Sequence, residues 1–221
     1  GRIWDAELSE SILGHVDLTT WKVPVASYAA KDSLRATTLY ASDRDCFIAL
    51  VDDQHPIMVP GREQDTLFRG FIARNSEVGC ATYELFLFLY RMICDNRIIH
   101  GLGEARHLRI RHTSGGPMRF MHQATPALND YVNAATQDTV DIIQRASDKV
   151  IGKDDQAVAV WLRQRGFSQG VADQAVAVAA TEQGNPHSLW NTVQGVTAVA
   201  QGLEFGDERL DLESKASKLL D

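Results

Sequence analysis

The feature that most constrains the fold is a long apolar segment, residues 81–94, which lies between a polar turn and a basic segment. In a helix, Ala81, Leu85 and Phe88 share one face, and apolar residues also occupy much of the opposite face. A helix that is apolar on nearly all sides must be buried, and this segment is too short to span a bilayer. The pattern therefore predicts a core helix that lies across a sheet.

The sequence before this segment alternates β-rich stretches with short polar turns. The stretches are residues 37–41, 46–51, 57–59 and 66–74. Short apolar stretches that are separated by short polar turns with Asp, Ser and Pro residues predict an antiparallel β-meander. Ahead of the meander, Leu8, Ile12 and Leu13 indicate a short helix or an extended arm.

Helical patterns dominate the second half of the chain. The expected helices span residues 127–150, 154–165, 171–183, 189–201 and 207–220, with Ser168 and Ser188 as N-caps. The predicted fold class is α+β: an N-terminal antiparallel β-meander packed on one buried helix, followed by a helical C-terminal half. The expected domains are an α+β core with a basic centre over residues 1–122 and a helical region over residues 123–221.

Charge is distributed unevenly along the chain, whose net charge is −7. Residues 62–119 contain nine Lys/Arg and six Asp/Glu, whereas the flanking segments are acidic. The overall charge argues against nucleic-acid binding by the whole surface, but a basic centre can form a local site for phosphate. Three cysteines and no recognisable signal peptide predict reduced thiols, a cytoplasmic location and no membrane segment.

Residues 107–112 alternate between cationic and apolar side chains. In a strand, His107, Arg109 and Arg111 point to one face, and Leu108 and Ile110 point to the other. Such a basic face can follow a nucleic-acid backbone, and the alternative is an edge strand whose charges prevent aggregation. The candidate nucleic-acid contacts are Arg69, Arg74, Arg97, His107, Arg109 and Arg111, with Tyr83 or Phe71 as an aromatic that stacks on a base.

Metal and cofactor sites are not expected. Asp52, Asp53 and His55 are metal-type ligands, but Asp is also favoured in hairpin turns for backbone reasons. His100, His107 and His112 do not share a face, which argues against zinc. The sequence therefore predicts neither a metal nor a cofactor.

The polar turn before the apolar segment contains Asn75, Ser76, Glu77 and Gly79. We expect Ser76 to cap or support the start of the next element and Glu77 to lie at the positive end of a helix. An enzyme that uses Glu77, His107 or His112 as acid or base, or Cys80 as nucleophile, remains an alternative. No nucleophile–base pair is recognisable from the sequence, so the prediction is a non-enzyme.

The central stretch resembles a family of phage- and plasmid-borne proteins that carries a domain of unknown function. The resemblance rests on Asn75-Ser76-Glu77-Val78-Gly79, on Arg91-Met92-Ile93-Cys94-Asp95-Asn96 and on Arg111-His112-Thr113, and more weakly on residues 191–197 and Glu208-Arg209. The family has Gly where this chain has Arg97. The meander and core helix are also similar to those of the ring-forming annealing proteins of the RecT and Red-beta type.

The resemblance implies a role in mobile DNA. The leading hypothesis is a phage- or plasmid-encoded protein that binds or anneals single-stranded DNA in recombination or replication, and that forms a homo-oligomer. The alternative is a non-enzymatic interaction module whose acidic helical half, residues 120–221, binds a phage or host protein. A hydrolase or nuclease is the third hypothesis.

Overall fold

The structure is a computed structural model of the chain. It describes residues 4–14, 16, 19–24, 39–41, 44–59, 61, 66–91, 96–99 and 107–221. The chain divides into two units. The first unit comprises residues 1–56, 67–92 and 99–134, and the second comprises residues 57–66, 93–98 and 135–221. Strands dominate the first unit and helices dominate the second, so the predicted α+β class is confirmed.

The first unit is built on an antiparallel sheet. Its strands are β1 (Trp21–Lys22), β2 (Leu39–Ala41), β3 (Cys46–Asp52), β5 (Thr66–Asn75), β6 (Tyr83–Arg91) and β8 (His107–Ile110). Both β1 and β2 pair with β3, and the sheet then continues through β5 and β6 to β8. The predicted antiparallel meander is therefore confirmed, and β6 is a central member of it.

The helix expected over residues 81–94 is wrong, because this segment forms strand β6. All nine residues of β6 are buried. Because both faces of the strand are covered, apolar residues occur on both, and the alternation of apolar and polar residues that marks a half-exposed strand is absent. Such a run looks the same in a buried helix and in a strand that is covered on both faces. Its aromatic residues, which include Phe86, Phe88 and Tyr90, favour the strand. Residues 92–95 lie outside the described part.

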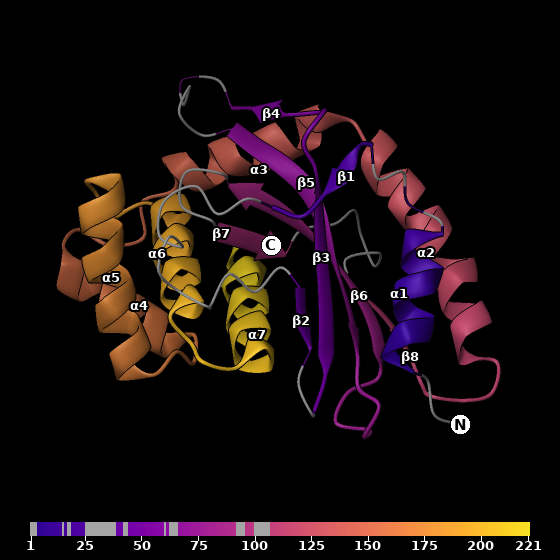
Figure 1. Cartoon of the computed structure of the whole chain (residues 1–221). Coiled ribbons are helices and arrows are strands. Elements are labelled where there is room, and N and C mark those ends of the chain that lie inside the picture. The colour runs from indigo at the N-terminus through magenta and orange to yellow at the C-terminus, as the bar shows by residue number, and fades with distance from the viewer. Residues whose placement is uncertain are drawn as a thin grey trace. The chain divides into compact units, whose positions relative to one another are not determined.

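Two helices, rather than the one expected, pack on the sheet of the first unit. Helices α1 (Asp5–Leu13) and α2 (Gly116–Asn133) lie on the same side of β3, β6 and β8 (Figure 1). The core between the helices and the sheet is made of Leu8, Ile12, Ile48, Leu50, Phe71, Tyr83, Leu85, Leu87, Phe120 and Leu128. Of the two alternatives expected around Leu8 and Ile12, a short helix or an extended arm, the structure has the helix.

The C-terminal end of α2 is anchored to the sheet by two polar contacts. Tyr131 donates from its hydroxyl to the Phe88 carbonyl oxygen at 2.5 Å. Arg69 on β5 donates to the carbonyl oxygens of Val132 at 3.2 Å and Ala134 at 2.7 Å. The last carbonyls of a helix have no partner within it, so Arg69 satisfies a requirement of the helix end.

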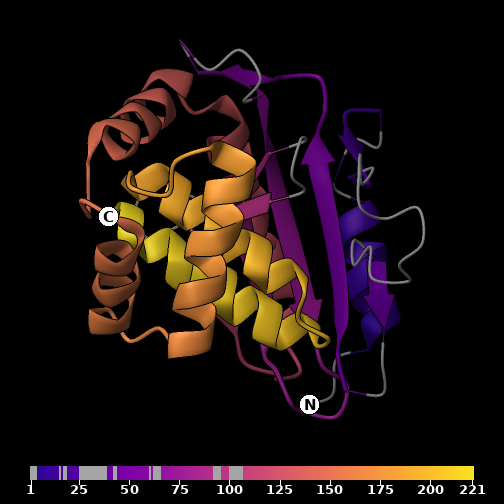
Figure 2. The same ribbon diagram turned by 90° about the vertical axis from the view of Figure 1, so that its left-hand side faces the viewer.

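The second unit contains helices α3 (Thr136–Asp148), α4 (Asp155–Gln164), α5 (Gln169–Gln183), α6 (Leu189–Gln201) and α7 (Gly206–Ser217), a 3-10 turn (Lys218–Leu220), strand β4 (Ile57–Met58) and most of β7 (Asn96–Ile99). Helix α6 packs against α3, α5 and α7, and Figure 2 shows these helices from a second side. The expected N-caps are confirmed: Ser168 accepts from Val171 N, and Ser188 accepts from Asn191 N. No helix in the described residues is sufficiently long and apolar to cross a membrane.

The single helix expected over residues 127–150 is wrong. Helix α2 already begins at Gly116 and contains Pro126, and the chain leaves the helical conformation at Ala134 and Ala135 before α3 begins. A proline inside a helix usually marks a boundary, which explains the late start that the sequence predicted. Neither Gly nor Pro stands at the true break, so the pattern gave no signal for it.

A buried ion triad ties β7 to α7 within the second unit. Glu213 is fully buried and its Oε1 accepts from Arg97 Nε at 3.0 Å and from Arg209 Nε at 2.9 Å. Its Oε2 makes no hydrogen bond within the described residues. A buried carboxylate without its cations would be strongly unfavourable, so the three side chains form one structural element.

We expect Glu213→Ala to lower the free energy of unfolding by about 3–5 kcal/mol, because it leaves two arginines without their carboxylate. Urea unfolding followed by circular dichroism measures the change. The matched control is Glu182→Ala, an exposed carboxylate on α5, which should stay within about 0.5 kcal/mol of the wild type. Equal stability of the Glu213 and Glu182 variants would contradict the structural role of the triad.

We expect Gly70→Ala to destabilise the first unit by about 1–3 kcal/mol, because the space for a side chain is already filled. A Cβ at Gly70 would lie 2.6 Å from Phe88 Cε2 and 2.9 Å from the Leu50 carbonyl oxygen. Gly115→Ala is the control, since a Cβ there meets no atom within 4 Å. Chemical denaturation of both variants measures the effect. The same unfolding midpoint for Gly70→Ala and Gly115→Ala would contradict the close packing at Gly70.

Candidate functional site

A row of charged side chains crosses the face of the sheet that does not carry α1 and α2. Arg74 on β5 pairs with Phe47 on β3 and with Glu84 on β6, and Glu84 pairs with Arg109 on β8. Residues that are directly paired point to the same face. The four side chains of Phe47, Arg74, Glu84 and Arg109 therefore form a continuous band, here called the charged row.

Glu84 is the centre of the charged row. Its Oε2 lies 3.5 Å from Arg74 Nη1, and its Oε1 lies 3.2 Å from Arg109 Nε. Thr82 Oγ1 donates to Oε1 at 3.0 Å, and His107 Nε2 lies 3.7 Å from the same oxygen. Glu84 thus holds two arginines and one histidine around one buried carboxylate.

The pKa of Glu84 lies below its usual value. Burial raises this pKa, but the interactions with His107 and Thr82 and the charge of Arg74 outweigh burial and keep the carboxyl ionised. Arg74 has a second carboxylate, since its Nη2 donates to Asp45 Oδ2 at 3.1 Å, and its guanidinium lies 5.1 Å from the centre of the Phe47 ring. Arg74 is therefore fixed inside the row.

The outer end of the site is exposed. The side chain of Arg109 is 66% exposed, whereas that of Glu84 is 6% exposed. His107 stacks on Phe86, with ring centres 4.0 Å apart and planes 15° apart, and its side chain is 39% exposed. Arg111, just after β8, is also exposed, whereas Ile110 is buried, so the predicted alternation of this strand is confirmed.

The six candidate nucleic-acid contacts separate into three groups. His107, Arg109 and Arg111 lie together on or next to β8. Arg74 is largely buried in the charged row. Arg69 is buried against the end of α2, and Arg97 belongs to the second unit, where Glu213 holds it. The structure therefore brings the first three together on an accessible strand and gives the other three partners inside the protein.

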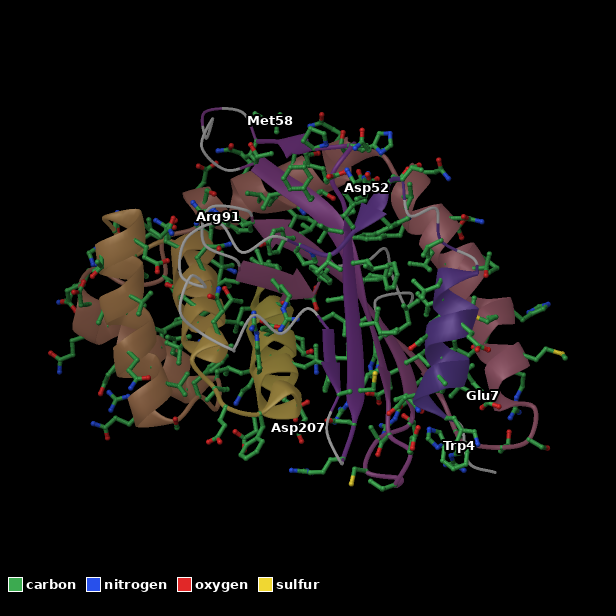
Figure 3. The ribbon with its side chains drawn as sticks, viewed as in Figure 1. Trp4, Glu7, Asp52, Met58, Arg91 and Asp207 are labelled. Atoms are coloured by element: carbon green, nitrogen blue, oxygen red, sulfur yellow. The ribbon has the colours of Figure 1, made fainter. Side chains whose placement is uncertain are left out.

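The motif turn joins β5 to β6 and holds the start of α1. Asn75 donates from Nδ2 to Asp5 Oδ1 at 2.7 Å, and Glu77 Oε1 accepts from the Asp5 backbone at 2.9 Å. Figure 3 marks Trp4 and Glu7 at this end of α1. Glu77 lies at the N-terminus of a helix, as expected. The helix is α1, however, and not the segment that follows the turn.

Ser76 and Gly79 shape the turn itself. The Ser76 hydroxyl donates to the Arg44 carbonyl oxygen and accepts from Cys80 N at 2.9 Å, so it supports the loop rather than capping a helix. Gly79 has φ +83°, a conformation that favours glycine. Burial raises the pKa of Asp5 despite the Asn75 hydrogen bond, and the charges of Glu77 and Asp45 add to the rise. These contacts give the turn a structural role.

The polar turn after β3 also has a structural explanation. Asp52 Oδ1 accepts from Gln54 N at 3.0 Å, and Asp52 Oδ2 lies 2.8 Å from His55 Nδ1. Asp53 pairs with Lys22 at 2.8 Å. In the described part of the chain, no group of three or more His, Cys, Asp or Glu side chains is arranged to hold a metal ion. His100 lies outside that part.

Sequence reasoning missed the two carboxylates of the site, Glu84 and Asp45. The helix expected from the sequence includes residue 84, and a helical residue has no fixed relation to Arg74 or Arg109. In a strand over residues 83–91, the hairpin formed by the motif turn places Glu84 opposite Arg74.

We expect Glu84→Gln to lower the free energy of unfolding by about 1–3 kcal/mol near neutral pH, where the ionised carboxylate holds its cations. Because its folded-state pKa is lowered, this stabilisation exists above the unfolded-state pKa of about 4.3 and is lost as the pH falls through the folded-state value. Urea unfolding at several pH values should show the difference between variant and wild type shrinking toward acid pH. The exposed Glu208→Gln is the control, and a difference that does not vary with pH would contradict the assignment.

The comparisons with known proteins identify a family but no activity. The model of a domain of unknown function (DUF932) matches residues 29–201, which include the charged row, the motif turn and most of the helical half. No curated protein and no solved structure shows significant similarity to the chain. Because the match covers more than half of the sequence, this chain belongs to the DUF932 family.

Proposed function

We propose that the first unit binds single-stranded DNA through the exposed side chains of His107, Arg109 and Arg111. In this proposal the protein is a non-enzymatic, cytoplasmic DNA-binding or annealing protein of phage or plasmid type that acts as a homo-oligomer. The observation that carries the proposal is the two-thirds exposure of Arg109 next to a second exposed arginine at the same strand.

The electrostatics of the charged row support this proposal. Its carboxylate Glu84 and the neighbouring carboxylate Asp45 are buried, whereas Arg109 extends into solvent. The surface therefore presents positive charge, and the matching negative charge is held underneath. A phosphate can approach Arg109 from outside, because Glu84 occupies only one side of the guanidinium, and Arg offers several donors in a planar fork.

A single strand fits this surface better than a duplex. The His107 ring, which stacks on the buried Phe86, is 39% exposed and belongs to the same strand as Arg109. Unstacked bases pack on aromatic faces while arginines contact the backbone, and a duplex hides its base faces. The resemblance to proteins of mobile DNA makes single-stranded DNA the natural first ligand.

We expect Arg109→Ala combined with Arg111→Ala to weaken binding of a fluorescent single-stranded oligonucleotide in anisotropy measurements. Each phosphate contact on a single strand contributes about 0.7 to the slope of log K against log salt, so the double variant should lose about 1.4. Light scattering on the same sample gives the size of the complex.

The matched control is Lys149→Ala combined with Lys153→Ala, which removes two exposed charges from the second unit. This control should leave the affinity and the salt slope close to those of the wild type. Equal losses in the two double variants would mean that net charge, rather than the strand β8, governs binding. Absence of binding by the folded wild type at low salt would refute the proposed function.

A further inference from the structure

A cavity of about 320 Å³ lies in the first unit, away from the charged row. Its walls come from β1, from the turn after β3 and from the second half of α2, and Figure 3 marks Asp52 at this end of β3. The volume is near the lower limit of sites for small molecules, which range over about 300–1,000 Å³. The cavity thus suits one small ring system and not a longer chain.

His55 supplies an oriented nitrogen at the cavity wall. Its Nδ1 lies 2.8 Å from Oδ2 of Asp52, whose side chain is 1% exposed and whose other oxygen accepts from Gln54 N. Because Nδ1 faces the Asp52 carboxylate, Nε2 is the ring nitrogen that remains for a ligand. The His55 side chain is 65% exposed, so a ligand can reach this nitrogen. A ligand with a hydrogen-bonding edge can therefore pair with Nε2.

Asn129 and Asn133 on α2 supply amides at the opposite side. Asn133 donates from Nδ2 to the Asn129 carbonyl oxygen at 2.8 Å, which orients its side chain. The side-chain amide of Asn129 itself makes no hydrogen bond within the described residues. An amide presents a donor and an acceptor side by side, which matches the edge of a nucleobase such as adenine.

Apart from Thr20 and Thr125, the remaining described lining residues are apolar, and they include no Lys or Arg. Trp21 is held edge-on against Phe71, with ring centres 5.0 Å apart, and Leu128 and Val132 complete the apolar surface. Among the described residues, the buried carboxylate of Asp52 lies against the lining residue His55, and its negative charge disfavours an anionic ligand. The ligand must therefore be neutral, with apolar faces and a hydrogen-bonding edge.

We propose that this cavity is a binding site for a single nucleobase or nucleoside. The flat ring lies against Trp21 and Leu128, its edge pairs with the Asn129 amide, and His55 Nε2 makes a second hydrogen bond to the ligand. The site uses none of the arginines that contact DNA in the proposed function, so it can fail or succeed independently of that function. It adds selectivity for a base to a chain whose other site recognises phosphate.

Saturation-transfer NMR with adenosine as the probe tests the proposal. We expect transfer to the adenine protons from the wild-type protein. The dissociation constant should rise about tenfold or more in Asn129→Leu, which removes the amide and fills part of the cavity, and also in His55→Ala. The control is His122→Ala, an exposed histidine on the same helix that does not line the cavity, and it should bind like the wild type.

Three outcomes would overturn the proposal. They are the absence of transfer to adenosine, guanosine, cytidine and uridine from the folded wild type, equal transfer to ribose alone, and binding that is unchanged in Asn129→Leu and His55→Ala. Circular dichroism confirms that each variant is folded. The salt-dependent binding of single-stranded DNA is measured separately on the Asn129 variant, and its retention shows that the phosphate surface does not depend on this cavity.

Discussion

Burial of β6 on both of its faces is the constraint on which the rest of the first unit depends. One face carries Leu85 and Leu87 into the core beneath α1 and α2, and the other carries Phe86 and Phe88. A strand buried in this way pairs with neighbours on both edges, because its backbone groups have no access to water. Its pairing with β5 and β8 fixes the register that brings Arg74, Glu84 and Arg109 into one row.

Burial of β6 also determines how charged side chains are accommodated inside the protein. Glu84 occurs in a strand that is otherwise almost entirely apolar, and it remains ionised because cations from two other strands surround it. Arg69 and Arg97 show a similar use of arginine inside the protein, at a helix end and at a buried carboxylate. The number of arginines near the centre of the sequence therefore overstates the positive surface, to which Arg109 and Arg111 are the main contributors among the predicted contacts.

Local patterns were sufficient to predict the α+β class, the antiparallel pairing, α1 and the caps of α5 and α6. They were sufficient because turns, caps and exposed alternation depend on residues that are close in sequence. The type of residues 83–91 was missed because burial on two faces removes the periodicity that separates a strand from a helix. The break between α2 and α3 was missed because Ala134 and Ala135 have no intrinsic preference to end a helix. The alternation of residues 107–111 was sufficient to predict the exposed side chains of the candidate site. The positions of its buried carboxylates could not be predicted, because they depend on the register between strands.

The close fit between Gly70 and Phe88 has a consequence for how this sheet can change over evolution. The Phe88 ring fills the space that a side chain at position 70 would need. The side chains at positions 70 and 88 must therefore fit together into one fixed volume. A larger residue at position 70 is compatible with the same sheet only if position 88 becomes smaller. Members of the family should therefore show correlated substitution at these two positions, and the pair can serve as a marker of the β5–β6 register in sequences whose strands are hard to recognise.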